Sequence, residues 1–189
     1  RNILPNSGYN RYNFTFRDVT KFLKDKLTVD LSASYILQDN KNMIAAGKYF
    51  NPLPALYLFP RGDDFDNVRL YQRWDESRNL YTQAWDYGSG DMSFQNPYWI
   101  MNKMINQTKK RRYMLSANLK YDVTDWLDVT GRVKVDNADM DITEKRYAGT
   151  DTNFAGEKGM YSIIKRNDRQ IYADAIANIC LLYTSDAAD

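Results

Sequence analysis

The chain has 189 residues, and its 26 basic and 24 acidic side chains give a formal net charge of +2. It contains no histidine, which removes the commonest general base and the commonest neutral metal ligand, so we expect no enzyme and no cofactor. Aromatic residues make up 14% of the chain, and this favours β-structure because aromatic rings suit pleated surfaces. No apolar run approaches the roughly 18 residues of a transmembrane helix.

Two strands are predicted near the start of the chain, at residues 10–19 and 26–38. In the first, Tyr12, Phe14 and Phe16 alternate with polar residues, and in the second every other residue from Leu27 to Leu37 is apolar. A period of two is that of a strand, because successive side chains point to opposite faces. The polar residues 20–25 between the two runs predict a short connection.

Residues 39–110 form a long connection that is too aromatic for a disordered linker. Asn96 and Pro97 are residues preferred at the N-cap and first position of a helix. They precede apolar residues spaced to share one helical face, namely Ile100, Met101, Met104 and Ile105. Asp63 or Asp64 is predicted to cap a shorter helix that reaches Tyr71.

A long hairpin is predicted at residues 111–123 and 127–140. Apolar residues occupy alternate positions from Tyr113 to Tyr121, and after the turn from Leu127 to Val135, with Gly131 among them and polar or charged residues between. Met114 alone breaks the polar set. Each strand exceeds the five or six residues usual in soluble sheets and reaches the roughly 9 to 11 that cross a bilayer when tilted.

A second long connection follows at residues 141–168, and a fifth strand is predicted at 169–179. The connections therefore alternate short, long, short, long, which is typical of outer-membrane barrels. We predict an all-β fold of antiparallel up-and-down strands from a transmembrane β-barrel, with long, partly helical extracellular loops. Five strands cannot close a barrel, so we expect an open, curved sheet that exposes one apolar convex face. A soluble β-sandwich with solvated polar faces is the alternative, because it shows the same alternation.

The two ends of the chain carry separate expectations. Residues 180–189, CLLYTSDAAD, resemble the translation of a transposase sequencing adaptor, and we exclude them from the fold as non-native. The excluded tail contains Cys180, the only cysteine. Because Arg1 is not a start residue, we expect targeting information to lie upstream. The partial barrel is therefore assigned to residues 1–179.

Several stretches resemble the SusC/RagA family of TonB-linked outer-membrane transporters of Bacteroidota. They are FNPLPALYLFPRGDDF at residues 50–65, QNPYW at 95–99, and YDVTDWL at 121–127 with Gly131-Arg132 after it. The resemblance implies a plugged barrel of about 22 strands, of which this chain supplies five. It also implies a SusD-like lipoprotein as a lid, energy from TonB through an N-terminal region that is missing here, and import of glycans or peptides.

Four aromatic residues of the first long connection are candidates for stacking on sugar rings, because an aromatic face offers apolar contact to the C–H face of a pyranose. They are Trp74, Trp85, Tyr87 and Trp99. The alternative is that they form the core of the loop itself, which needs buried surface to stay ordered. Arg61, Asp63 and Asp64 are candidates for hydrogen bonds to sugar hydroxyls, with turn and capping roles as the alternative.

Two charged stretches suggest other sites. The acidic residues Asp136, Asp139, Asp141 and Glu144 are spaced in part like a calcium loop, but the glycine that an EF-hand loop requires is missing, so we expect no metal. The basic run 109–112 comes where the third strand would leave the extracellular loop, and Lys145, Arg146, Lys165, Arg166 and Arg169 occupy the corresponding ends of the next two strands. Cations at one membrane face suit lipopolysaccharide phosphates better than nucleic acid, and a merely solvated rim is the alternative.

The sequence as a whole predicts a piece of a non-enzymatic transporter in the cell outer membrane. Its expected partners are a SusD-like lipoprotein, TonB, outer-membrane lipid and lipopolysaccharide, and a glycan or peptide substrate. The alternative function is a soluble all-β carbohydrate-binding module.

Overall fold

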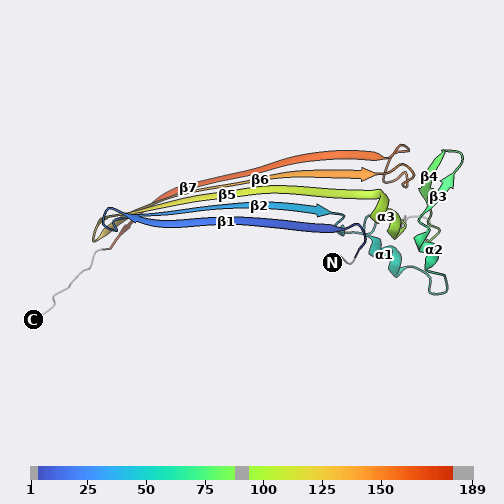
Figure 1. Cartoon of the computed structure of the whole chain (residues 1–189), viewed down its shortest axis with the longest axis horizontal. Coiled ribbons are helices and arrows are strands. Elements are labelled where there is room, and N and C mark those ends of the chain that lie inside the picture. Colours follow the sequence, from blue (N-terminus) through green and yellow to red (C-terminus); the bar gives the residue numbers. More distant parts are fainter. Residues whose placement is uncertain (1–3, 88–93, 181–189) are drawn as a thin grey trace, which may run out of the picture. The chain divides into compact units, whose positions relative to one another are not determined.

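The computed structural model describes residues 4–87 and 94–180, and its main feature is one open sheet of long strands (Figure 1). The sheet order is β1-β2-β5-β6-β7, so neighbours in sequence are neighbours in space, and the sheet is antiparallel. Its strands are β1 (Gly8–Phe22), β2 (Leu27–Lys41), β5 (Met104–Thr124), β6 (Leu127–Arg146) and β7 (Met160–Ile179). The predicted all-β fold, with five strands in sequential order and an open sheet, is confirmed. The excluded tail beyond Cys180 lies outside the described residues.

The strands extend further than their side-chain alternation indicates. β5 begins at Met104 instead of residue 111, β6 continues to Arg146, and β7 begins at Met160 instead of residue 169. Backbone pairing accompanies the extension of β5: the Asn42 amide donates to the Asn106 carbonyl at 2.7 Å, and the Asn42 side chain adds to it by accepting from the Asn106 amide at 3.0 Å. Because backbone hydrogen bonds do not depend on side-chain polarity, a strand can continue where its apolar face ends.

The second long connection is consequently shorter than expected and covers residues 147–159. Gly149 and Gly159 have φ of +92° and +86°, which side chains rarely permit. A Cβ at Gly149 would lie 2.2 Å from the Tyr81 carbonyl, so glycine also allows this loop to approach the first long connection.

Three short helices and one small hairpin lie in the first long connection. The helices are α1 (Pro52–Tyr57), α2 (Asp66–Arg69) and α3 (Pro97–Lys103), and β3 (Gln72–Asp75) pairs with β4 (Leu80–Gln83) in antiparallel register. The N-cap of α3 is Asn96, as predicted, but Met104 and Ile105 belong to β5, because the chain leaves helical geometry at Met104 to join the sheet. The shorter helix was predicted less well: its N-cap is Phe65, and it ends before Tyr71.

The chain divides into two compact units, which we call the loop unit and the sheet unit. The loop unit comprises Arg1–Arg11, Gln38–Lys110 and Met140–Arg166, and the sheet unit comprises Tyr12–Leu37, Arg111–Asp139 and Asn167–Asp189. The loop unit has a core of Trp99, Ile100 and Met104, against which Phe50, Tyr71 and Phe154 pack. No helix in the described part of the chain has the length and hydrophobicity needed to span a membrane.

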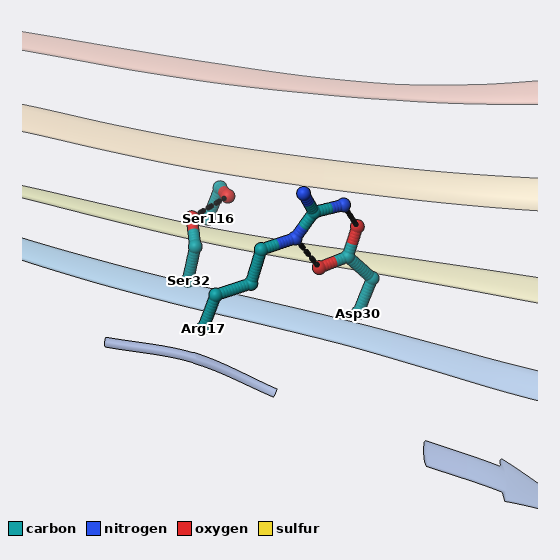
Figure 2. A network of polar contacts seen from close by, with 4 residues as sticks. All are labelled: Arg17, Asp30, Ser32 and Ser116. Atoms are coloured by element: carbon teal, nitrogen blue, oxygen red, sulfur yellow. Dashed lines mark hydrogen bonds and ion pairs between the residues drawn. The ribbon is translucent and has the colours of Figure 1, made fainter. Parts of the chain in front are cut away.

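One face of the sheet unit is polar, and its side chains link each strand to the next. Arg17 of β1 holds Asp30 of β2 through two hydrogen bonds of 3.1 and 2.9 Å, and Ser32 of β2 contacts Ser116 of β5 at 2.7 Å (Figure 2). Two further bidentate pairs complete the series, Arg112 with Asp136 between β5 and β6 and Arg132 with Asp174 between β6 and β7. The pairs fix the strand register, because a shift by one residue would separate every pair at once.

The opposite face of the sheet unit is apolar and exposed. Leu115, Leu119 and Val133 are each almost half exposed. The other large exposed residues with the same strand alternation are Tyr12, Phe14, Phe16, Phe22, Leu31, Tyr35, Tyr113, Tyr121, Val123, Val129, Ile171 and Ile179. Asp18 and Thr20 interrupt this surface on the edge strand β1, where their side chains hydrogen-bond to each other at 2.7 Å. A sheet of one layer has no second layer to cover such a surface, so a large apolar face stays in contact with the surroundings.

Candidate functional site

Asn96 connects the chain segments that surround the candidate site. Its side chain is fully buried, its Oδ1 accepts from the Tyr98 amide at 2.8 Å, and this bond caps α3. Its Nδ2 donates to the Val68 carbonyl at 2.9 Å and to the Ala84 carbonyl at 3.0 Å. One asparagine therefore joins α2, the segment after β4 and the start of α3.

The segment after β4 carries an edge-to-face series of aromatic rings. Trp85 and Tyr87 have ring centroids 5.0 Å apart, Tyr87 and Phe59 are also 5.0 Å apart, and Phe59 and Phe65 are 5.7 Å apart. Aromatic pairs at these distances stabilise their arrangement beyond simple burial. The rings of Trp85 and Tyr87 are thus held in place before any ligand arrives.

Asp63 lies beside Tyr87 of this aromatic series, and Asp64 follows Asp63 in the chain. Burial raises the pKa of Tyr87, and its hydrogen bond to Asp63 raises the pKa further, together with the charges of Asp63, Asp86 and Asp64. Asp64 has a local role, because its Oδ1 accepts from the Asp66 amide at 3.0 Å. The predicted residues Trp85, Tyr87, Asp63 and Asp64 are therefore brought together, whereas exposed Arg61 makes no hydrogen bond or ion pair to any described residue.

A groove of about 420 Å³ lies beside Trp85 and Tyr87. Its other lining residues are Asn67, Leu70, Gln72, Arg73, Ala84 and Asp86. Arg73 and Asp86 form an exposed ion pair of 3.4 Å at the groove, so the charge of this wall is balanced. An aromatic wall beside paired charges and amides suits a neutral ligand with many hydroxyl groups.

Two polar atoms of the groove residues have no partner within residues 4–87 and 94–180. They are the Nε1 donor of Trp85 and the Oε1 acceptor of Gln72, and both are closed to solvent. Buried donors and acceptors in folded proteins are nearly always paired, so each atom is costly as it stands.

Trp99 and Trp74 have opposite environments, and neither lines the groove. Trp99 is 1% exposed, and its Nε1 donates to the Thr150 hydroxyl at 3.0 Å, so both ring faces are covered inside the loop unit. Trp74 is 50% exposed and pairs with Tyr81 across β3 and β4 at 5.1 Å between centroids. Of the two, only Trp74 offers an accessible ring to a sugar.

A second, apolar pocket of about 220 Å³ lies elsewhere in the loop unit. Met43, Ile44, Phe50, Met101 and Met104 line it together with Glu144 and Arg146 at its polar part. Arg146 lies over the Phe50 ring at 4.5 Å and pairs with Glu144 at 3.4 Å. The pocket has room for a small apolar group.

The charged stretches noted in the sequence are distributed over several contacts. Asp136 pairs with Arg112, Asp139 accepts from Asn167 at 2.6 Å, and Glu144 pairs with Arg146. No group of three potential metal ligands occurs in the part of the chain that the structure describes. The basic run 109–112 lies inside β5, so its side chains alternate between the two faces instead of forming one patch.

Sequence reasoning missed Gln72, Arg73 and Asp86 as groove residues. They are ordinary polar residues of a hairpin and its flank, and only the pairing of β3 with β4 and the Asn96 contacts bring them beside Trp85. No alternation marks them in the sequence, because the run Tyr71-Gln72-Arg73-Trp74 does not alternate between apolar and polar residues.

Comparison with known proteins does not assign the chain to a family. No protein-family model matches the chain, and no curated protein is significantly similar to it. The argument for function therefore rests on the two units themselves.

Proposed function

We propose that this chain is part of a SusC/RagA-type TonB-dependent transporter of the outer membrane, which imports glycans or peptides without altering them. The observation that carries the proposal is the exposed apolar face of the sheet unit, opposite a face on which ion pairs and hydroxyls link every strand to the next. A lipid-facing surface and a polar lumen require this division of one barrel wall. The resemblance of the motifs at residues 50–65 and 95–99 supports the choice of this family.

The proposal also assigns the partners. A SusD-like lipoprotein would cover the loops, and TonB would act through a plug and an N-terminal segment outside this chain. The two edge strands β1 and β7 would pair with further strands of the barrel, because an unpaired edge cannot lie in hydrocarbon.

Membrane insertion is the first test. The full-length protein that contains this chain is refolded into phosphatidylcholine vesicles and floated in a density gradient after a carbonate wash. We expect it to float with the vesicles and to shift its gel mobility on heating, because a closed barrel resists detergent until it is boiled. Recovery of a folded protein at the bottom of the gradient would refute the transporter and favour the soluble module.

Substrate binding at the groove is the second test. Soluble oligosaccharides from starch, pectin and mannan, and a tryptic digest of casein, are titrated calorimetrically into the full-length protein. Trp85→Ala should weaken binding of the preferred mixture roughly tenfold, because loss of one stacked ring costs about 1.5 kcal/mol. Trp85→Phe keeps the stacking and loses only the Nε1 donor, so its loss should be smaller.

The matched control is Tyr57→Ala, which removes an aromatic ring that is 85% exposed and does not line the groove. It should leave the affinity unchanged. If Trp85→Ala and Tyr57→Ala bind every mixture as well as the unaltered protein, the groove is not the binding site.

A soluble carbohydrate-binding module is the second candidate, and the same groove favours it. The groove would serve either protein, so binding alone does not separate the two functions. Floatation does, since a module has no use for the exposed apolar face of the sheet unit.

A further inference from the structure

The apolar pocket of the loop unit is separate from the aromatic groove, since the two share no lining residue. The buried part of its wall is formed by Ile100, Met101 and Met104, which are 7% or 8% exposed. The accessible part includes Met43 and Ile44, which are 56% and 51% exposed. All of its lining residues belong to the loop unit. The pocket therefore has an apolar interior that a ligand can reach from solvent.

The volume of the pocket, about 220 Å³, limits the ligand to one small group. An apolar cavity of about 150 Å³ holds one benzene molecule, so this pocket suits one aromatic ring or one branched aliphatic side chain. A sugar ring would leave its hydroxyl groups unpaired against the apolar wall. Methionine side chains adapt to different apolar shapes, so Met43, Met101 and Met104 allow the wall to fit more than one such group.

Glu144 and Arg146 form the polar part of the pocket. The Glu144 carboxylate accepts from Arg146 at 3.4 Å and from Asn106 at 3.5 Å, both longer than the roughly 2.7–3.2 Å usual for such bonds, so it can accept a further donor. Arg146 donates to the Phe154 carbonyl and lies over the Phe50 ring at 4.5 Å. Its guanidinium carries more N–H donors than its contacts with Glu144 and Phe154 use.

The charges of this polar part compensate each other. Lys145 lies between Glu144 and Arg146 on β6, so its side chain points to the other face, where the ammonium lies over the Tyr161 ring at 5.7 Å. A charged ligand end would be attracted by one member of the Glu144–Arg146 pair and repelled by the other. A neutral amide finds a partner in each, because Glu144 accepts an N–H and Arg146 donates to a C=O.

We propose that the pocket binds one apolar side chain of a peptide, with the peptide groups of that residue at Glu144 and Arg146. The side chain fills the buried part, the adjoining N–H donates to Glu144, and the adjoining C=O accepts from Arg146. A sugar has no apolar group of this size, and a fatty acyl chain has no N–H donor. The inference rests on the proposed function only in assigning the bound peptide to the transported substrate, and of glycans and peptides it selects peptides.

Ligand binding by the full-length protein, in nanodiscs or in buffer if it does not enter them, tests the proposal by saturation-transfer NMR. The first probe is N-acetyl-Gly-Phe-Gly-amide. The same peptide with serine in place of phenylalanine should bind about tenfold more weakly or worse, because it buries no large apolar group. Leucine in that place should change the affinity less than about threefold, since the methionines adapt.

Benzyl alcohol carries the aromatic ring without the amide groups. It should bind about tenfold more weakly than the phenylalanine peptide, because it lacks the two amide hydrogen bonds. Glu144→Ala should weaken binding of the phenylalanine peptide about fivefold and leave benzyl alcohol unaffected. Equal affinities for the two ligands, or equal losses of both in Glu144→Ala, would overturn the assignment to a peptide.

Ala45→Phe tests the pocket itself, because Ala45 lines it and a ring there would occupy the space. This variant should weaken binding of the phenylalanine peptide about tenfold or more, the contribution of one large buried side chain. The matched control is Ala46→Phe, the same change at the next residue, which is exposed and does not line the pocket. It should leave the affinity unchanged. Equal losses in the two variants, or no loss in Ala45→Phe, would overturn the proposal.

The transporter and the peptide site can fail separately. A protein that binds the phenylalanine peptide selectively but does not float with vesicles refutes the transporter and leaves the site in place. A protein that floats but binds the phenylalanine and serine peptides equally refutes only the peptide site.

Discussion

Replacing Leu119 by arginine places a charge in the middle of the apolar face, and Thr130→Arg places the same charge on the polar face at almost the same height. Lys120 contacts Asp128, so Thr130 lies opposite Asn118, the residue next to Leu119. The two variants therefore differ in the face that carries the arginine and hardly in depth. If the sheet unit lies in a bilayer, only Leu119→Arg meets lipid.

The strand geometry gives the depth and the cost. The apolar positions of β5 run from Tyr113 to Val123, which at about 3.3 Å per residue and a tilt of about 45° span roughly 23 Å, close to the apolar band of roughly 25 Å in membrane barrels. Leu119 lies roughly 9 Å from the nearer end, close to the midplane. Arginine there costs about 2–4 kcal/mol, whereas Thr130→Arg should cost less than about 1 kcal/mol.

The assay is reversible unfolding of the full-length protein in phosphatidylcholine vesicles by guanidinium chloride, followed by tryptophan fluorescence. We expect the folding equilibrium constant to fall roughly 30-fold or more for Leu119→Arg, since each 1.4 kcal/mol is a factor of ten. Thr130→Arg should stay near the unaltered value. Equal costs for the two variants would refute the assignment of the faces, and with it the membrane location.

Three further changes test the local structure. Asn96→Ala should destabilise α3 by about 3 kcal/mol in hydrogen exchange, because it removes the helix cap and the donor to the Val68 and Ala84 carbonyls. Asn51→Ala removes only the cap of α1 and should cost about 1 kcal/mol. Similar losses in the two variants would contradict the joining role of Asn96. Lys24→Gly should stabilise the protein by about 0.5–1 kcal/mol in denaturant titration, because residue 24 has φ of +56°, and destabilisation would show that the turn is not strained. The raised pKa of Tyr87 means that the folded protein favours the neutral phenol. The stabilisation by this phenol is therefore present below the ordinary tyrosine pKa of about 10 and is lost as the pH rises from there through the higher pKa of the folded state. Asp63→Asn should move the ultraviolet titration of Tyr87 back toward the ordinary pKa, and an unmoved titration would contradict the contact.

The strands were predictable because their signal is local. A sheet with one apolar face imposes a period of two on the sequence, and the runs beginning at Leu27 and Tyr113 display it without help from the rest of the chain. The cap of α3 was predictable for the same reason, since Asn96 and Pro97 satisfy the first amides of the helix within one turn.

The ends of the elements and the members of the groove were not predictable in this way. Met104 has the spacing of a helical residue but begins β5, because backbone pairing on the side of β6 competes with the helix and prevails: the Tyr147 amide donates to the Lys103 carbonyl at 3.0 Å. Trp85 and Trp99 look alike in the sequence, yet one lines the groove and the other lies in the core. Contacts between residues distant in sequence made that difference.

The sequence by itself determined the strand order, the two faces of the sheet and the cap of α3, because alternation and capping act between near neighbours in the chain. Only the tertiary structure decided which aromatic rings are accessible and which strands share ion pairs. Arg17 meets Asp30, and Arg132 meets Asp174, only when two strands adopt one register, and burial of Trp99 requires Thr150 from a distant loop. Such contacts depend on the whole fold, so no local pattern encodes them.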